Sequence, residues 1–306
     1  MITRPRLAIS LGDPRGIGPE ITAAALQDSR VAAAADYVLV GPRGTTLDVQ
    51  QAVGDWTSHG TISDAGRFAG LAVDRAIQLA QSGDVQGIVT APLDKRALLA
   101  GGYDFPGHTE LLAARFGVAD VAMMFAGPRL TVALATIHIP LAEVVRALTT
   151  ARIRRVVELV HASLVRDFAI AAPRIGVVGL NPHAGEGGLL GREDAEVIAP
   201  ALLPPIPGTT LVGPLVPDVA FRDALDRRYD ALVAMYHDQG LIPVKLVDFD
   251  EAVNVTLGLP IVRTSPDHGT AYDIAGRGLA RPTSMRRAVA LAFAMADRRA
   301  GVGSAP

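Results

Sequence analysis

The sequence predicts an α/β fold in which a largely parallel sheet is flanked by helices, and two observations lead to it. Short apolar runs, bounded by Gly, Pro, Asn or Asp, alternate with longer segments whose apolar residues recur at helical spacing. Polar clusters also follow nearly every apolar run. Ligands of open α/β sheets bind beyond the carboxyl ends of the strands, so these clusters mark where a ligand is expected.

Seven short apolar runs are the strand candidates. They have the length and the flanking turn residues that are typical of buried strands. In chain order they are Leu7–Leu11, Tyr37–Val40, Gly87–Thr90, Leu130–Thr136, Ile175–Leu180, Ala231–Tyr236 and Leu259–Arg263.

Two long segments between these runs have a clear helical period. In Asp64–Gln81 the apolar residues fall on one face, and Gly83 is placed to end the helix. Thr150–Arg166 shows the same spacing. A shorter helix is expected over 109–116.

Length and composition restrict the classes of protein. The 306 residues suit one large unit or two lobes, and 49 % hydrophobic residues allow a sizeable core. A net charge of −2 without a basic run argues against a nucleic-acid partner. No apolar stretch reaches the ~18 residues of a membrane span, and the first run is too short for a secretion signal, so we expect a cytoplasmic protein. Because cysteine is absent, His, Asp or Glu would hold any metal.

Three of the seven histidines follow strand candidates closely: His138, His183 and His237. Loops that leave one edge of a sheet can converge, and three imidazoles hold a divalent cation while leaving positions open for substrate. Asp218 and Asp238 lie nearby in the sequence. The alternative is that these are ordinary loop histidines bonded to backbone, and the spacing, which matches no local metal motif, leaves both readings open.

The segment Gly12–Glu20 follows a strand candidate and opens a helix, with Pro19 suited to the first helical turn. Free backbone N–H groups at that helix start could bind an anion. The segment matches neither the dinucleotide fingerprint nor the P-loop. A tight turn whose glycines serve only the backbone is the alternative.

Polar residues in three further places could bind an anionic ligand. His108 and Thr109 begin a helix candidate, where a phosphate or carboxylate is favoured, although a plain helix cap is the alternative. Lys245 and Arg263 stand in apolar segments, with Asn254 between them in sequence. A charge there needs an anionic partner, unless the side chain reaches solvent or forms a structural ion pair.

The loop after the last strand candidate, 267–276, contains imidazole and hydroxyl donors beside glycine. Such a loop could enclose a nucleotide, and an ordinary surface loop is the alternative. Taken alone, its residues do not decide between the two.

Eight strings of the chain resemble, in order and over almost its whole length, the 4-hydroxythreonine-4-phosphate dehydrogenase family. The loop 268–276 is also similar to the nucleotide-binding loop of the isocitrate and isopropylmalate dehydrogenase superfamily. The eight strings are Gly12–Glu20, Ala91–Lys95, Pro106–Glu110, Thr136–Leu141, Gly179–Glu186, Met235–Gly240, Asn254–Pro260 and Arg263–Gly276.

The resemblance implies a two-lobed fold of the isocitrate/isopropylmalate dehydrogenase type, with mostly parallel sheets flanked by helices and the active site in the cleft between the lobes. The first lobe, on the cofactor side, would comprise 1–125 and 260–306. The second, on the metal and dimer side, would comprise 126–259. A homodimer with shared active sites is expected.

The resemblance also assigns roles to residues. A divalent metal (zinc, magnesium, cobalt or manganese) would be bound by His138 and His183 of one subunit and His237 of the other. Substrate would lie at His108, Thr109, Lys245, Asn254 and Arg263, and Lys245, Asp218 and Asp238 are the candidates for catalysis. NAD, or NADP, would be bound by His268, Gly269, Thr270, Ala271 and Asp273.

The implied reaction belongs to pyridoxine 5′-phosphate (vitamin B6) biosynthesis. The secondary hydroxyl of 4-(phosphooxy)-L-threonine would be oxidised by NAD, and the resulting 3-keto acid would lose CO2 to give 3-amino-2-oxopropyl phosphate. The expected partner is therefore this small phosphorylated hydroxy amino acid, with no nucleic acid and no membrane.

Other activities remain as alternatives. Members of the same family oxidise D-threonate or D-erythronate 4-phosphate, and a divergent branch oxidises a cyclic dihydrodiol acid. The presence of both His108 and Thr109 argues against that branch. A phosphate acyltransferase-like enzyme or a non-catalytic sugar-phosphate-binding protein would not need three metal histidines. One departure concerns Arg15, which stands where the family usually has a small residue.

Overall fold

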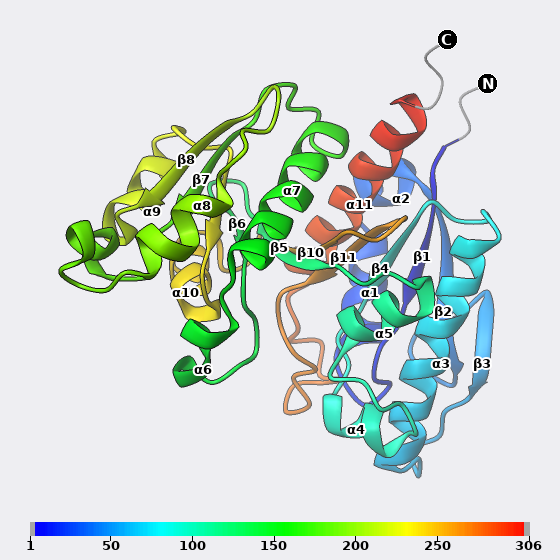
Figure 1. Ribbon diagram of the computed structural model, residues 1–306. Helices are drawn as coiled ribbons and strands as arrows, with labels where there is room; N and C mark the ends of the chain where they lie inside the picture. The colour runs from blue at the N-terminus through cyan, green and yellow to red at the C-terminus, as the bar shows by residue number, and fades with distance from the viewer. Residues whose placement is uncertain (1–3, 303–306) are drawn as a thin grey trace. The chain divides into compact units, whose positions relative to one another are not determined.

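The computed structural model describes residues 4–302 and divides into two compact units (Figure 1). Unit 1 combines residues 1–119 with 259–306, and unit 2 spans 120–258. The expected boundary after residue 125 falls inside strand β5 (Ala122–Ala126). Because β5 pairs on both sides with strands of unit 2, residues 120–125 belong to that unit. Residue 259 belongs to unit 1.

Unit 1 contains a sheet whose strands are all parallel. Its spatial order is β3-β2-β1-β4-β11, so the carboxyl ends of these strands share one edge. The strands are β1 (Arg6–Ser10), β2 (Asp36–Arg43), β3 (Gln51–Asp55), β4 (Gly87–Thr90) and β11 (Val262–Pro266).

Two groups of helices cover this sheet. Helix α3 packs on β1, β2 and β4, whereas α11 packs on β4 and β11 and contacts α1 and α2. Right-handed crossovers place the two groups on opposite faces. The helices are α1 (Gly18–Leu26), α2 (Ser29–Ala34), α3 (Ile62–Gln81), α4 (Lys95–Ala100), α5 (His108–Phe116) and α11 (Thr283–Val302).

Helix α3 begins two residues before its predicted start because Thr61 and Asp64 form a capping box. Its predicted end at Gln81 is confirmed. Gly83 follows with a φ of +80°, a conformation in which glycine avoids the strain of a side chain.

Unit 2 contains a mixed sheet of order β10-β5-β6-β9-β7-β8. Strand β5 runs antiparallel to β10 and β6, and the pairs β6–β9, β9–β7 and β7–β8 are parallel. Besides β5, the strands are β6 (Thr131–Leu134), β7 (Arg174–Val178), β8 (Thr210–Leu215), β9 (Ala231–Ala234) and β10 (Val253–Leu257).

The helices of unit 2 include one with the predicted bounds, α7, whose buried side chains repeat at helical spacing. The others are α6 (Leu141–Ala147), η1 (Pro182–Gly188), η2 (Asp194–Ile198), α8 (Ala199–Ala201), α9 (Pro217–Leu225) and α10 (His237–Asp248), with α7 at Thr150–Arg166. Over residues 4–302, no helix is long and apolar enough to span a membrane.

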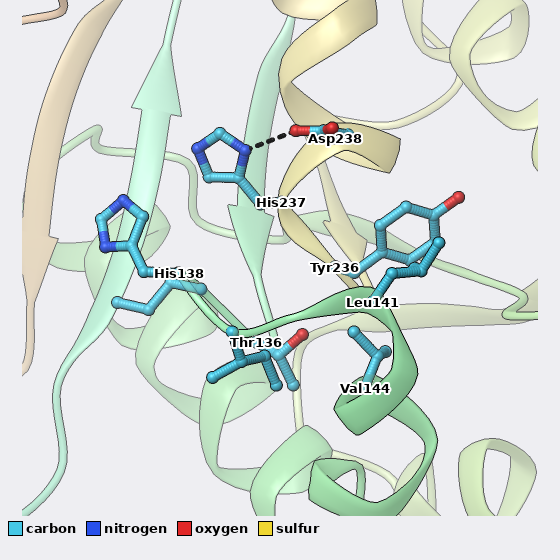
Figure 2. Close-up of a pocket in the computed structure, with 9 residues that line it drawn as sticks. Thr136, His138, Leu141, Val144, Tyr236, His237 and Asp238 are labelled. Atoms are coloured by element: carbon cyan, nitrogen blue, oxygen red, sulfur yellow. Dashed lines mark hydrogen bonds and ion pairs between the residues drawn. The ribbon is translucent and has the colours of Figure 1, made fainter.

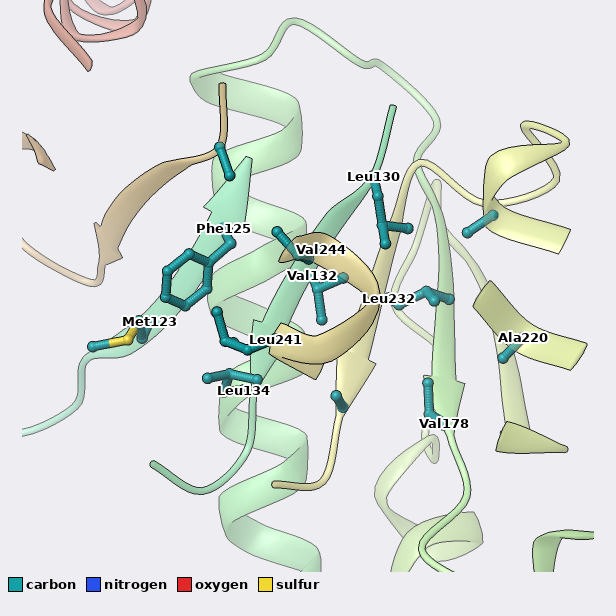
Figure 3. Close-up of a cluster of buried hydrophobic side chains, with 13 residues drawn as sticks. Met123, Phe125, Leu130, Val132, Leu134, Val178, Ala220, Leu232, Leu241 and Val244 are labelled. Atoms are coloured by element: carbon teal, nitrogen blue, oxygen red, sulfur yellow. The ribbon is translucent and has the colours of Figure 1, made fainter. Parts of the chain in front are cut away.

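One apolar core of unit 2 lies where α9 and α10 pack on the sheet. Side chains of β5, β6 and β9 meet Leu241 and Val244 of α10 and Ala220 of α9, as Figure 3 shows. Burial of this apolar surface fixes α10 against β6 and β9, and therefore fixes the position of the helix start at His237.

Four strands were not predicted: β3, β5, β8 and β10. Strand β8 contains Gly213 and Pro214, which weaken a strand pattern, and it tolerates them at the edge of its sheet. The predicted strand Leu259–Arg263 begins only at Val262, because Gly258 has a φ of +92° and the chain turns there.

Two neighbouring leucines of α4 test how far burial determines stability. Leu98 is 0 % exposed and Leu99 is 58 % exposed. We expect Leu98→Ala to lower the free energy of unfolding by about 2–5 kcal/mol, because it leaves a cavity. Leu99→Ala is the matched control and should change it by less than about 0.5 kcal/mol. Urea unfolding measures both, and equal effects would contradict the packing described for α4.

Candidate active site

Three adjacent parallel strands of unit 2 bring the predicted metal histidines to one edge of the sheet. Strand β9 pairs with β6 on one side and with β7 on the other. His138 follows β6, His237 follows β9 at the start of α10, and His183 follows β7. The common edge that the sequence predicted is therefore present.

Two of these histidines lie side by side. The ring centroids of His138 and His237 are 5.5 Å apart, and both rings line a pocket of about 220 Å³ (Figure 2). The other lining residues are Thr136, Ile137, Ile139, Leu141, Val144, Tyr236 and Asp238.

Asp238 orients the ring of His237. Its Oδ1 lies 2.7 Å from Nδ1 of the ring. Because a carboxylate only accepts hydrogen bonds, this contact places the proton on Nδ1 and leaves the lone pair of Nε2 available. A histidine held in this way by a carboxylate is typical of metal ligands.

His183 does not complete a metal site within one chain. Among residues 4–302, no three His, Asp or Glu side chains lie close enough together to hold a cation. The two histidines that one chain brings together are His138 and His237, whereas the resemblance pairs His138 with His183.

The backbone at two of the three histidines is strained. His138 has a φ of +43° and His183 a φ of +51°, and the left-handed conformation continues from His183 through Gly187. Each non-glycine residue held in this region costs about 1–3 kcal/mol, and such outliers gather at functional sites.

Asp194 holds the strained turn of His183 in place. This buried carboxylate accepts hydrogen bonds from the backbone N–H groups of Leu180 (2.8 Å) and Asn181 (3.2 Å) and from the Asn181 amide (2.9 Å). The sequence analysis missed Asp194, and its position after Glu193 in a polar stretch gives no signal that would have found it.

The remaining predicted residues of unit 2 are dispersed. Lys245 lies seven positions after Asp238 on α10, which is close to two helical turns, and its Nζ is 5.4 Å from the ring centroid of Phe249. Asp218 is exposed in the first turn of α9, where the helix dipole favours a carboxylate. Oδ1 of Asn254 on β10 is buried and has no hydrogen-bond partner.

Unit 1 places a positive charge beside a neutral imidazole. Burial lowers the pKa of Arg263 to about 10, which leaves it charged at neutral pH, and its Nη2 donates to Thr90 Oγ1 at 2.7 Å. Burial, with the charge of Arg263, lowers the pKa of His108 well below its usual value. Thr109 is buried next to His108 at the start of α5.

Among the buried polar atoms of unit 1 that lack a hydrogen-bond partner are Nε2 of His108 and Oγ of Ser10. Ser10 pairs in register with Thr90, whose hydroxyl accepts from Arg263. Since buried polar atoms are nearly always bonded, these two atoms are candidates to bond a polar ligand. Ser10 and Thr90 were not predicted, because their only signal is a hydroxyl at the end of an apolar run.

The predicted nucleotide loop is packed on the segment 12–20. The N–H of Ile17 donates to the Thr270 carbonyl at 2.9 Å, and a Cβ on Gly16 would meet that same oxygen at 2.8 Å. Gly12 has a φ of +70°. These two glycines therefore have backbone reasons to be there, as the alternative reading proposed. The predicted cofactor residues lie in irregular structure: His268, Gly269, Thr270, Ala271 and Asp273.

The chain matches known proteins over nearly its full length. The family model "PdxA: Pyridoxal phosphate biosynthetic protein PdxA" matches residues 15–292. A 4-hydroxythreonine-4-phosphate dehydrogenase of Geobacter metallireducens is 42 % identical, and the match covers 99 % of both chains. A Bradyrhizobium diazoefficiens protein named "Putative D-threonate 4-phosphate dehydrogenase" is 41 % identical, covering 94 % of this chain and 96 % of that one.

Solved structures of known proteins are similar to this chain in fold. The crystal structure of a 4-hydroxythreonine-4-phosphate dehydrogenase from Klebsiella pneumoniae has a TM-score of 0.83 and 37 % identity, covering 96 % of this chain and 98 % of that one. Isocitrate dehydrogenase from Methylococcus capsulatus has a TM-score of 0.54 at 18 % identity, covering 94 % and 84 %, and confirms the predicted fold alone. The chain is therefore an oxidoreductase that belongs to the PdxA family of pyridoxal phosphate biosynthetic proteins.

Proposed function

We propose that this protein oxidises 4-(phosphooxy)-L-threonine with NAD, or NADP, to a 3-keto acid that decarboxylates to 3-amino-2-oxopropyl phosphate. One observation carries the proposal: a buried arginine beside a neutral histidine, Arg263 and His108, in a chain whose full-length relative is named for this activity. A phosphorylated amino acid has anionic groups that a buried guanidinium can bind.

Substrate binding is assigned to both units. In unit 1 the guanidinium of Arg263 supplies charge, and neutral His108 offers one ring donor and one acceptor. Thr109 adds a hydroxyl at the N-terminal end of α5, where an anion is favoured. In unit 2 we assign the same role to Lys245 and to Asn254, whose buried Oδ1 can accept from the substrate.

The metal is assigned to His138, His183 and His237. The donor set fits a divalent cation, because two imidazoles already lie together and Asp238 leaves Nε2 of His237 able to bind. Zinc, cobalt, magnesium or manganese, when bound, would favour the ionised substrate hydroxyl and polarise the carbonyl that follows. Imidazole donors suit zinc and cobalt best.

The dinucleotide is assigned to the loop His268–Asp273, which lies in unit 1. Its nicotinamide would accept the hydride. The protein must then take the hydroxyl proton and return a proton to the carbon that loses CO2. Lys245, Asp218 and Asp238 are the groups that we assign to these proton transfers, with Asp238 also orienting His237.

We propose that the active enzyme is a homodimer in which a second copy completes the metal site. The helix that begins at His237, together with its C-cap residue Phe249, exposes an apolar stripe on one face. The three residues, spaced four and three apart, are Ile242, Leu246 and Phe249, which are 58 %, 79 % and 61 % exposed. A second copy that covers this stripe would lie against the same helix that holds His237.

A direct assay tests the reaction. Purified protein with each divalent metal, NAD or NADP, and 4-(phosphooxy)-L-threonine should produce reduced cofactor and CO2 in equal amounts. D-Threonate 4-phosphate must be assayed beside it. The relative named for that substrate is 41 % identical to this chain, and the relative named for 4-hydroxythreonine 4-phosphate is 42 % identical. Faster turnover of D-threonate 4-phosphate would reassign the substrate, and no reduced cofactor from either would contradict the proposal.

The neutral state of His108 gives a pH dependence. Its pKa is lowered on folding, so below about pH 6.5 the unfolded chain binds a proton that the folded chain does not. The free energy of unfolding should therefore fall as the pH drops below that value, and the fall should be smaller in His108→Gln. Urea unfolding at a series of pH values measures this, with exposed His59→Gln as control. Parallel curves for wild type and His108→Gln would show the assignment to be wrong.

Subunit mixing tests the shared metal site. Single His→Ala proteins at 138, 183 and 237 should each lose metal and activity. If the two subunits divide His183 and His237 of each site between them, mixed dimers of His183→Ala with His237→Ala contain one site with both lesions and one intact site. We therefore expect exchange of subunits to restore activity and bound metal, up to one site per dimer.

A second mixture identifies the two ligands that share a subunit. His138→Ala with His237→Ala should regain activity if the partner provides His237, as the resemblance implies. It should regain none if His138 and His237 of one chain act together, as their 5.5 Å separation would allow. Recovery in neither mixture, under proven subunit exchange, would place all three ligands in one chain.

A further inference from the structure

Arg15 connects two loops of unit 1 through its guanidinium. The first loop is the segment 12–20, which contains Arg15, and the second is the loop 268–276. Its Nε and Nη2 donate to the two carboxylate oxygens of Asp13, at 3.0 and 2.6 Å. Nη2 also lies 2.8 Å from the hydroxyl oxygen of Tyr272, and the guanidinium carbon is 4.8 Å from the centre of the Tyr272 ring. The Tyr272 hydroxyl in turn donates to Asp13 at 2.7 Å. The three side chains thus form a closed set of contacts.

The charge of Asp13 makes this set a strong constraint. Its side chain is 0 % exposed, and it accepts from the backbone N–H of Arg15 as well as from the guanidinium and the tyrosine. Without Arg15 a buried carboxylate would lose its positive partner, which is strongly unfavourable. Burial and the negative charge of Asp13 raise the pKa of Tyr272, so its hydroxyl stays protonated as a donor.

Backbone contacts extend the connection along both loops. The N–H of Asp13 donates to the Pro92 carbonyl, which fixes the first loop at the end of β4. The Glu20 carboxylate accepts from the N–H groups of Gly276 (2.9 Å) and Ala280 (3.4 Å). The first loop therefore forms a base on which the second loop, 268–276, lies.

We infer that Arg15 is a positioning residue for dinucleotide binding: with Asp13 and Tyr272 it holds the loop 268–273 in its binding conformation. The inference rests on the proposed function, which assigns the dinucleotide to that loop. A small side chain at position 15 could not reach Asp13 and Tyr272 together. Pre-forming a loop reduces the ordering cost of binding, so the effect should fall on dinucleotide affinity.

The test compares Arg15→Ala with Arg15→Lys and a matched control. Arg67→Ala removes another arginine that stacks on an aromatic ring (Phe68, 4.6 Å) and pairs with an aspartate (Asp64, 3.7 Å), but on the exposed side of α3. Calorimetry should show the Kd of NAD raised roughly tenfold in Arg15→Ala, equivalent to about 1.4 kcal/mol. Arg15→Lys should recover part of this loss, and Arg67→Ala should bind as wild type does.

Two readouts separate this role from a general loss of structure. Hydrogen exchange of amides 268–276 should become faster in Arg15→Ala and not in Arg67→Ala. The KM for the dinucleotide should rise while the KM for the phosphorylated substrate stays the same. Should Arg15→Ala fail to fold, Tyr272→Phe, which removes one hydroxyl at an exposed residue, is used in its place and should change exchange and affinity in the same direction.

The outcomes distinguish a failure of this inference from a failure of the proposed function on which it rests. If hydrogen exchange of amides 268–276 is unchanged in Arg15→Ala and in Tyr272→Phe while the wild type binds NAD normally, the positioning role is overturned. The proposed function is then unaffected. Faster exchange with unchanged NAD affinity shows that the loop does not hold the dinucleotide, which overturns the inference. A wild-type protein that binds neither NAD nor NADP overturns both.

Discussion

Parallel pairing of β9 with β6 and β7 is the constraint on which the candidate metal site depends. The ladder of backbone hydrogen bonds sets neighbouring strands a little under 5 Å apart, roughly the distance at which side chains at their ends begin to meet. Packing of α10 on the sheet then fixes where His237 starts the helix. The chemistry of the imidazoles is thus placed by backbone bonding and apolar burial, neither of which involves the histidines themselves.

The sequence predicted the fold best where one physical signal was strong. Helix α7 has its predicted bounds, because its apolar residues repeat at helical spacing over 17 residues and Thr149 caps its start. Strand β5 was missed although all of it is buried, since a run of five apolar residues has no period that separates a strand from a helix. The antiparallel pairing of β5 also could not be read from periodicity, because pairing direction depends on the path of the chain.

The candidate site was predictable as a set of residue types and less so as a geometry. Histidines after strands stand out in a sequence, and the common sheet edge followed from them. Asp194, Ser10 and Thr90 do not stand out, since each is a common polar residue whose importance comes from burial and from the groups it faces. The sequence also could not show which ligands share a chain, because the contact between His138 and His237 depends on the positive φ of His138.

The left-handed segment from His183 to Gly187 affects how long the protein survives proteolysis. Segments that are costly to fold are the first to open, and open segments are where proteases cut. A ligand that binds His183 in this conformation but not in the opened chain would shift that equilibrium by mass action. The occupancy of the site and the lifetime of the polypeptide would then be linked through a single loop, which the hydrogen bonds of Asp194 hold in place.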